Sequence, residues 1–305
     1  MTGPDALSVG SATTFFGPWE VVISDWRTAL DQIDLVLTRA SQARELTWRG
    51  VSDASWSLHS SLYRHFLAHG LKPTEDKLVK FEQALLQKAR KSWRFDHHSA
   101  LESLAHIQHY GGPTRLLDVT FNPLVALWFA TETKFDRSGK RLPDVDGRIF
   151  AFDTTSRQIE LDLVWGSRGL PWRSPPTGWR HDLPHVWRPP SYNERIPAQN
   201  SAFLLGGVPS YTTGGNRQYR KAPGPASTMG LWRIREVLDA TSVNLRMNSL
   251  DRSLRANATP AYTLRITAEA KEVIRRRLED NYGFSVSTIY PDLFGLANNI
   301  SNGLL

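Results

Sequence analysis

Polar residues that could bind or transform a ligand are concentrated near the middle of the chain. Residues 105–122 read AHIQHYGGPTRLLDVTFN. In an extended segment the side chains of Asp118 and Thr120 point to the same side, because they are two residues apart. A helix predicted to begin after Asn122 would present free backbone N–H groups, which suit a polar or anionic ligand. This stretch therefore indicates one wall of a binding pocket.

The same residues also allow a purely structural interpretation. Asp118, Thr120 and Asn122 could satisfy the first N–H groups of the following helix. Arg115 could then form an ion pair with Asp118. The spacing alone does not separate a helix cap from a pocket.

Two other segments carry a single polar residue with a possible chemical role. Arg49 lies at the end of a short predicted strand in LTWRG, beside an expected open backbone at Gly50, and a guanidinium binds phosphate or ribose oxygens through two parallel hydrogen bonds. Gln199 lies in RIPAQNSAFLL, where an amide can orient a hydroxyl or amide group without titrating. The structural alternatives are a surface arginine in a turn and a hydrogen-bonded core amide.

The nine histidines suggest acid–base chemistry more than a metal centre. Several lie three or four residues apart, but no acidic residue completes a recognisable ligand pattern, so we predict no metal site. Histidine titrates near neutral pH, and His98 and His109 could therefore serve as the acid and base of a phosphodiesterase.

A segment rich in proline, tryptophan and arginine covers about residues 165–190. Aromatic rings alternating with guanidinium groups can stack on bases and neutralise phosphates, although such a segment can also form a structured lid over a core. The predicted nucleic-acid contacts are Arg168, Trp172, Arg173, Trp179, Arg180 and Arg188.

Composition narrows the class of protein. The formal net charge of +7 favours an anionic partner such as a nucleic acid, because a positive surface attracts anions. The absence of cysteine excludes disulfides and thiolate metal ligands and is typical of a reducing compartment. No apolar run reaches about 18 residues, and no signal peptide is recognisable. We expect a cytoplasmic protein that has no membrane-spanning segment.

The hydrophobic pattern mixes helices and strands without a repeat or a regular βαβ period, which indicates an α+β fold. One predicted helix, residues 75–94, would place Leu78, Phe81, Leu85 and Ala89 on its buried face and its charged residues in solvent. Further helices are predicted at residues 26–46, 99–108, 122–134, 268–283 and 290–301. Strands are predicted at residues 46–50, 114–120, 147–154, 194–207 and 261–270.

The polar segments occur in the order found in a known family. WRGVSDASWSLHSSLYR, LAHIQHYGGPTRLLDVTFNPLVALWFA, RIPAQNSAFLL and YGFSVSTIYPDLFGLA together resemble the FRG domain family. The order of these motifs is similar to that of the ADP-ribosyltransferase fold. The resemblance implies a split β-sheet core surrounded by helices and long loops. It implies an FRG domain over residues 44–305, with an insertion at about 165–190, after a helical extension at residues 1–43.

The resemblance also implies a function, namely transfer of ADP-ribose from NAD as the substrate. Arg49 would hold the phosphates or ribose of NAD, and the segment with Asp118 would shape the nicotinamide pocket. The residues implied to be catalytic are Arg49, Asp118 and Gln199. The residues implied to bind NAD are Arg49, Gly50, His109, Tyr110, Thr114, Arg115 and Thr120.

The acceptor suggested by the positive charge is DNA or RNA, so the enzyme would be a toxin or phage-defence effector with an antitoxin or defence partner. A second hypothesis is a nucleotide- or nucleic-acid-binding module without catalysis. It is favoured by Gln199, which is uncharged and stands where the third motif of ADP-ribosyltransferases has an acidic residue. The phosphodiesterase is the third hypothesis.

Overall fold

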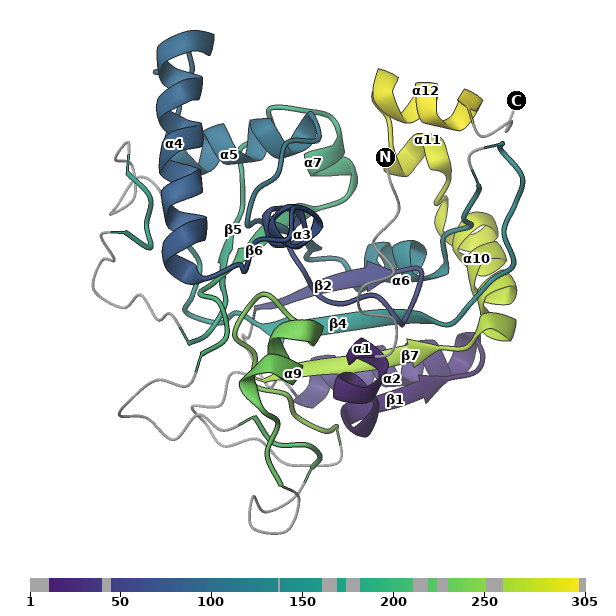
Figure 1. The fold of residues 1–305 in the computed structure, drawn as a ribbon. Helices are drawn as coiled ribbons and strands as arrows, with labels where there is room; N and C mark the ends of the chain where they lie inside the picture. Colours follow the sequence, from purple (N-terminus) through teal and green to yellow (C-terminus); the bar gives the residue numbers. More distant parts are fainter. Residues whose placement is uncertain are drawn as a thin grey trace.

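The chain is built around one mixed β-sheet. The structure is a computed structural model that describes residues 11–39, 45–136, 138–160, 169–173, 182–210, 219–223, 230–250 and 260–301. The sheet has seven strands in the order β1-β7-β4-β2-β3-β6-β5 (Figure 1). The strands are β1 (Glu20–Ile23), β2 (Leu46–Val51), β3 (Leu117–Thr120), β4 (Gly147–Asp153), β5 (His185–Trp187), β6 (Ser201–Leu205) and β7 (Ala261–Ile266). Only the β1–β7 pair among these strands is parallel. The predicted α+β class is confirmed.

The sheet is narrowest between β2 and β3. β2 pairs with β4 along its whole length, from Leu46 opposite Asp153 to Val51 opposite Arg148. In contrast, β2 and β3 are in register at one position, Trp48 opposite Thr120. Two parts of the sheet, β1-β7-β4-β2 and β3-β6-β5, are therefore joined by a minimal contact. Beyond this one position, β2 and β3 have no paired residues.

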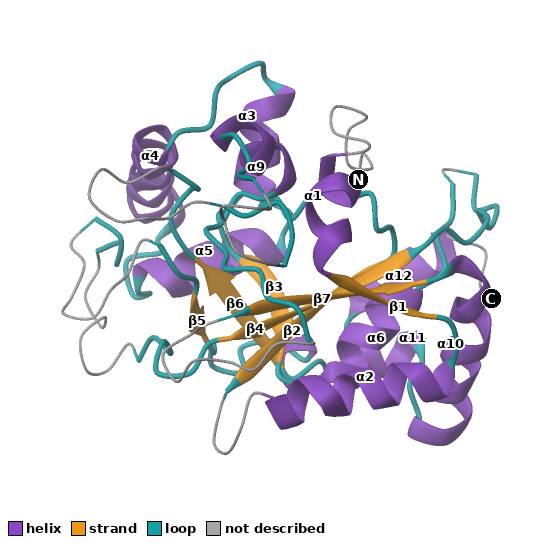
Figure 2. Ribbon diagram, turned by 90° about the horizontal axis from the view of Figure 1, so that it is seen from below, coloured by secondary structure: helices purple, strands orange, loops and turns teal. Residues whose placement is uncertain are grey.

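Helices cover both faces of the sheet. Figure 2 shows α2, α6 and α10 on one side and α1, α3 and α9 on the other. The described helices are α1 (Ser11–Phe16), η2 (Gly17–Trp19), α2 (Trp26–Arg39), α3 (Ser61–Ala68), α4 (Glu75–Trp93), α5 (Ala100–His109), α6 (Pro123–Thr131), α7 (Arg195–Ala198), α9 (Ile234–Ala240), α10 (Ala268–Tyr282), α11 (Val286–Ile289) and α12 (Leu293–Ser301). Among these helices, none is both long and apolar enough to cross a bilayer.

The N-terminal segment forms part of the sheet and of the core. β1 adds a parallel edge strand to β7, and the sequence pattern did not predict this strand. α2 places Ala29, Ile33 and Val36 in the core cluster that also contains the buried residues of α6 and α10. The segment before β2 thus contributes an edge strand as well as helices.

α6 lies directly against the sheet because two glycines let the backbones approach closely. Asn122 caps α6, its side-chain oxygen accepting a hydrogen bond from the Leu124 N–H at 2.9 Å, as the sequence predicts. A Cβ on Gly50 would lie 1.8 Å from the Ala126 carbonyl oxygen, and one on Gly147 would lie 2.1 Å from that of Ala130. Only glycine fits at these positions of β2 and β4.

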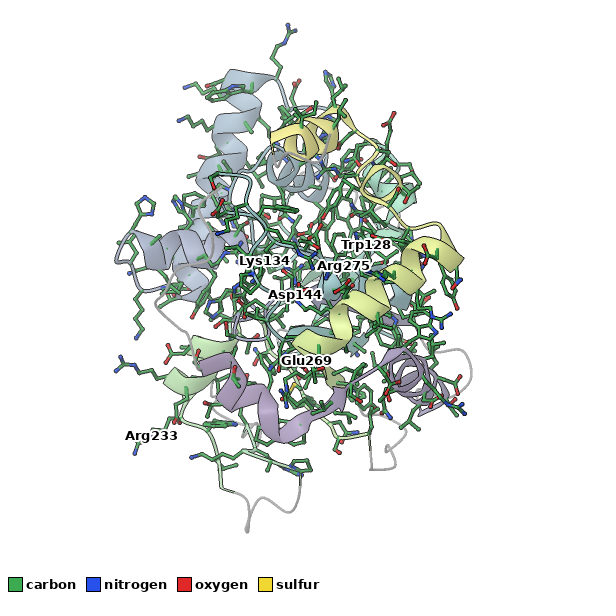
Figure 3. The ribbon with its side chains drawn as sticks, turned by 90° about the vertical axis from the view of Figure 1, so that its right-hand side faces the viewer. Trp128, Lys134, Asp144, Arg233, Glu269 and Arg275 are labelled. Carbon is green, nitrogen blue, oxygen red and sulfur yellow. The ribbon has the colours of Figure 1, made fainter. Side chains whose placement is uncertain are left out.

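α10 holds the C-terminal end of α6 in place. Arg275 donates from Nε to the Thr131 carbonyl oxygen at 2.9 Å and from Nη2 to Asp144 at 3.0 Å. Figure 3 shows Arg275, Asp144 and Lys134 together on this face of the molecule. α10 ends where the sequence predicts, at Gly283, whose φ of +68° suits glycine.

The buried face of α4 differs from the predicted one. The structure fully buries Leu78, Glu82, Leu86 and Ala89, and it packs the predicted Phe81 and Leu85 partly buried against the core. The centre of the buried face is therefore shifted by about one position from the predicted one. Glu82, predicted to face solvent with the other charged residues, is fully buried. The reason is an ion pair with Arg115, which gives the carboxylate a partner in the interior.

We expect His59 to make folding stability depend on pH. Burial lowers the pKa of His59 to about 4, and its Nε2 lies 2.9 Å from the Leu238 carbonyl oxygen. Between pH 6.5 and 4 the unfolded chain therefore binds more protons than the folded one, so the free energy of unfolding falls as the pH falls. We expect a loss of up to ~3 kcal/mol across this window, measured by urea denaturation. His59→Gln should reduce this loss, whereas His97→Gln, at an exposed histidine, should leave it unchanged.

Candidate functional site

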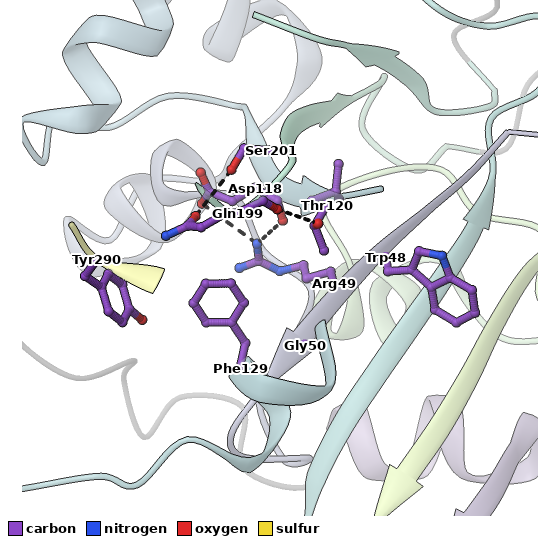
Figure 4. Close-up of a pocket in the computed structure, with 10 residues that line it drawn as sticks. Trp48, Arg49, Gly50, Asp118, Thr120, Phe129, Gln199, Ser201 and Tyr290 are labelled. Carbon is purple, nitrogen blue, oxygen red and sulfur yellow. Dashed lines mark hydrogen bonds and ion pairs between the residues drawn. The ribbon is translucent and has the colours of Figure 1, made fainter. Parts of the chain in front are cut away.

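A pocket of about 260 Å³ lies where β2 and β3 separate. Its walls come from β2, β3, α6, the start of β6 and the residue after α11, so segments distant in the sequence meet there. Figure 4 shows the guanidinium of Arg49 in the middle of these side chains, directed toward Asp118. The lining residues are Trp48, Arg49, Gly50, Asp118, Val119, Thr120, Phe129, Gln199, Ser201 and Tyr290.

Arg49 is the cationic group of the pocket. Its side chain is 22% exposed, and Nη1 donates to the Asp118 carbonyl oxygen at 2.5 Å. Nε is buried and has no hydrogen-bond partner among the described residues. Burial lowers the pKa of Arg49 while the nearby Asp118 carboxylate raises it, and a guanidinium remains charged at neutral pH in either case. A partly buried cation with an unused N–H can bind an anionic oxygen.

Asp118 is the anionic group of the pocket, and its side chain is 69% exposed. Oδ2 lies 3.8 Å from Arg49 Nη1, and Oδ1 accepts a hydrogen bond from Gln108 Nε2 at 2.8 Å. The Thr114 hydroxyl in turn donates to Gln108. Thr114 is buried and does not reach the pocket. It orients Gln108, which orients Asp118, so the predicted direct contact of Thr114 with a ligand is wrong.

Thr120 and Gln199 line the pocket, but their polar groups hold the chain together. The Thr120 hydroxyl donates to the Gln199 carbonyl oxygen at 2.6 Å and accepts from the Asn122 N–H at 3.0 Å. The Gln199 side chain donates to the Ile289 carbonyl oxygen at 2.8 Å and accepts from Ser201 at 3.3 Å. Gln199 lies in a turn after α7 and not in a strand, because β6 begins at Ser201 and not at residue 194 as predicted.

Gly50 is explained by packing rather than by an approaching ligand. The sequence predicts an open backbone at this position. The space beyond its Cα is instead filled by the backbone of α6, although the residue also borders the pocket. Gly50 therefore fixes how close α6, and with it Phe129, lies to β2.

Phe129 and Tyr290 contribute aromatic rings to the pocket wall, and neither was among the site residues predicted from the sequence. The rings of Phe129 and Tyr290 pack edge to face with centroids 6.0 Å apart. The Tyr290 hydroxyl donates to Glu132 at 2.7 Å, and burial raises the pKa of both groups. The Arg195 guanidinium lies 5.2 Å from the centre of the Tyr290 ring. The available signal for Tyr290 was the last of the four family-like motifs, YGFSVSTIYPDLFGLA.

Arg115 does not face the pocket, and both predictions for it are wrong. It is buried and forms an ion pair with Glu82, with Nε 2.6 Å from Oε1 and Nη2 2.8 Å from Oε2. Nη1 also donates to Glu75 at 2.8 Å. The guanidinium lies 4.4 Å from the centre of the Trp172 ring. Two carboxylates and an aromatic face give Arg115 better partners than Asp118 could.

The predicted histidine and tyrosine contacts lie elsewhere. Tyr110 is 83% exposed and packs against His109, with ring centroids 5.1 Å apart. His98 packs against His106 at 4.9 Å. None of these residues lines the pocket. The structure therefore gives no support from this pocket to a phosphodiesterase that uses His98 and His109.

The residues predicted to contact nucleic acid differ in their exposure and in their neighbours. Trp172 is buried and donates from Nε1 to Glu82 at 2.8 Å, so it is unavailable for base stacking. The Arg188 guanidinium lies 4.2 Å from the centre of the Phe121 ring. Arg173 is exposed. The remaining three, Arg168, Trp179 and Arg180, lie outside the described residues.

The Gln199→Glu variant tests whether a carboxylate can replace the amide at the position of the third motif. An ionised glutamate cannot donate to the Ile289 carbonyl oxygen, and it would place two acceptors together. We expect the variant to lose ~1–3 kcal/mol of stability, measured by urea denaturation. We also expect it to release no more nicotinamide from NAD than the wild type does. Ser201→Ala removes the longer hydrogen bond to the same amide and should cost less. Higher activity in Gln199→Glu would show that the position accepts a catalytic carboxylate.

The geometry defines an α+β protein with a polar pocket at the narrow junction of its sheet, where a partly buried arginine faces a carboxylate. Residues 44–139, which include Arg49, Asp118 and Thr120, match the family model of the FRG domain. The resemblance to the FRG domain family that the sequence indicates is thus confirmed over this part of the chain. The match extends from just before β2 to the segment after α6 and is shorter than the predicted range of 44–305.

Two further comparisons gave no match, either among curated proteins or among solved structures. Within the described ranges, no group of three or more His, Cys, Asp or Glu side chains is arranged to hold a metal ion.

Proposed function

We propose that this protein is an NAD-dependent ADP-ribosyltransferase that binds NAD in the pocket between β2 and β3. The observation that carries the proposal is the convergence of Arg49, Asp118 and Gln199 on this pocket. These residues come from the three segments whose order resembles that of the ADP-ribosyltransferase motifs. The narrow β2–β3 junction also suits the split sheet expected for that fold.

The residues present fit parts of NAD. The buried Nε of Arg49, without a partner among the described residues, suits a phosphate or ribose oxygen. Phe129 and Tyr290 offer apolar walls for a planar ring such as nicotinamide. Pockets for drug-sized ligands span roughly 300–1,000 Å³. The pocket volume of about 260 Å³ thus suits one end of the dinucleotide, with the remainder extending out of the pocket.

In the proposed reaction, a nucleophile of the acceptor bonds to C1′ of the nicotinamide ribose. The bond between C1′ and the nicotinamide nitrogen breaks, nicotinamide leaves with the electron pair, and the acceptor gives up a proton. Positive charge develops at C1′ during this exchange, and a nearby carboxylate stabilises it more than an amide does. Asp118 supplies that carboxylate, since the Gln199 amide is engaged with Ile289.

Incubation with NAD alone and with RNA, DNA or protein, followed by measurement of free nicotinamide, tests the proposal. An acceptor that stimulates release and becomes ADP-ribosylated is the expected result. In a cell, such an enzyme would act as a toxin or phage-defence effector restrained by an antitoxin or defence partner.

The second candidate function is a nucleotide-binding module without catalysis. The engagement of both polar ends of the Gln199 side chain within the protein favours it. This candidate predicts that NAD or another nucleotide binds and shields Arg49 while no nicotinamide is released with any acceptor. Calorimetric titration with NAD beside the release assay separates the two functions.

A further inference from the structure

A second concave site lies beside α4, away from the pocket already described. This cleft has a volume of about 320 Å³ and is formed by one side of α4 and residues 169–173. Leu86 and Leu170, both buried, form its apolar floor. Its polar lining consists of Gln83, Gln87, Arg90 and Arg173. Two guanidinium groups and two amides above an apolar floor suit an anionic ligand with flat apolar parts.

The C-terminal half of α4 is strongly positive. Residues 83–94, QALLQKARKSWR, contain four basic side chains and no acidic one. The nearest preceding carboxylate, Glu82, is buried and paired with Arg115, so it does not offset this surface charge. Lys88 and Lys91 are exposed on this half of the helix. The electrostatic potential therefore attracts polyanions to this half of the helix.

An exposed tryptophan continues the same side of the helix. Trp93 lies three residues after Arg90, a spacing that places the two on one side of α4. Its side chain is 60% exposed, and the Lys88 ammonium lies 5.6 Å from its ring centre. In Figure 1, α4 stands at the edge of the molecule and extends beyond its neighbours. The ring is thus accessible to a flat partner from solvent.

We propose that this surface, formed by Lys88, Arg90, Lys91, Trp93 and Arg173, binds single-stranded nucleic acid. The basic side chains contact the phosphates, and a base stacks on Trp93. Single-stranded binding sites combine a positive groove with aromatic rings in this way. A nucleic acid carries a flat base beside each phosphate, so a single ligand supplies partners for both the basic side chains and the exposed ring. Trp93 on this surface, and not the buried Trp172, is the aromatic side chain that stacks on a base.

Binding of fluorescein-labelled 12-nucleotide oligo(dT) and oligo(U), followed by fluorescence anisotropy between 50 and 300 mM salt, tests this proposal. Arg90→Ala/Arg173→Ala removes two phosphate contacts. It should weaken binding about tenfold or more and reduce the slope of log K against log salt by ~1.4. Trp93→Ala should weaken binding by ~5- to 100-fold and leave that slope unchanged.

The matched control is Arg27→Ala/Arg276→Ala, which removes the same charge from exposed positions on α2 and α10. Thermal melting verifies that each variant is folded. The proposal is overturned if folded wild-type protein does not bind the oligonucleotides at 50 mM salt. It is also overturned if the control pair weakens binding as much as the test pair does. Equal competition by polyglutamate, together with unaltered binding by Trp93→Ala, would identify an acidic protein partner instead.

No NAD is present in this assay. Loss of oligonucleotide binding therefore bears on the α4 surface alone, and failure of nicotinamide release bears on the β2–β3 pocket alone. If both sites act together, the strand held by α4 is the acceptor of the proposed reaction, and Trp93→Ala should then lower its modification without altering NAD affinity.

Discussion

Arg49→Ala is expected to lower nicotinamide release at least ~100-fold, because loss of one preorganised donor at a charged site typically costs that much or more. Arg49 is the cation that lines the pocket, and no other described lining residue carries a positive charge. Its removal also eliminates the buried Nε proposed to bind a phosphate or ribose oxygen. NAD affinity, measured by calorimetry, should fall together with activity.

Asp118→Asn separates binding from catalysis. The amide keeps the size of the side chain but removes the negative charge proposed to stabilise C1′. We therefore expect nicotinamide release to fall about 100-fold while NAD affinity changes little. Arg27→Ala, at an exposed arginine on α2, serves as the control and should match wild type. Full activity in both Arg49→Ala and Asp118→Asn would place the chemistry in another part of the molecule.

Arg115→Met is expected to destabilise the fold by ~3–5 kcal/mol, because it leaves the buried carboxylate of Glu82 without its cation. Burial raises the pKa of Glu82 even with Arg115 present, so the carboxylate depends on its partners. Urea denaturation at pH 7 gives the loss in stability. The part of the population that remains folded should bind NAD as wild type does, because Arg115 does not line the pocket.

The double variant Arg115→Met/Glu82→Gln provides the control for this ion pair. The neutral amide can still interact with the Trp172 N–H, so the double variant should be more stable than Arg115→Met alone. If Arg115→Met unfolds at the same urea concentration as wild type, the buried pair contributes nothing to stability. If it remains stable but loses NAD affinity, Arg115 acts at the pocket after all.

The sequence predicted the parts of the site that depend on local signals. Asn122 and Pro123 mark the start of α6, and the alternation of Asp118 and Thr120 places both beside the pocket. The order of the motifs predicted that Arg49 and Gln199 would join them. These features depend on residues close together in the chain or on a family pattern, which a single sequence can reveal.

Long-range partners could not be predicted in the same way. The helical period of α4 does not show that Glu82 is buried, because its partner Arg115 is distant in the sequence. Likewise, four residues at β1 carry too weak a pattern to reveal a parallel pairing with β7. Tyr290 was missed because its place beside Phe129 depends on how the C-terminal segment packs. In each case a tertiary contact decides the role of the residue.

The pocket wall formed by Gln199, Ser201 and Tyr290 has a practical consequence for work with fragments. A fragment cut at the ends of the FRG match would retain Arg49 and Asp118. It would lose those three wall residues, and it would also lose β4, which pairs with β2 along its whole length. Such a fragment would expose an edge of β2 and leave the pocket open on the side of the three lost residues. Activity should therefore be sought in the full chain.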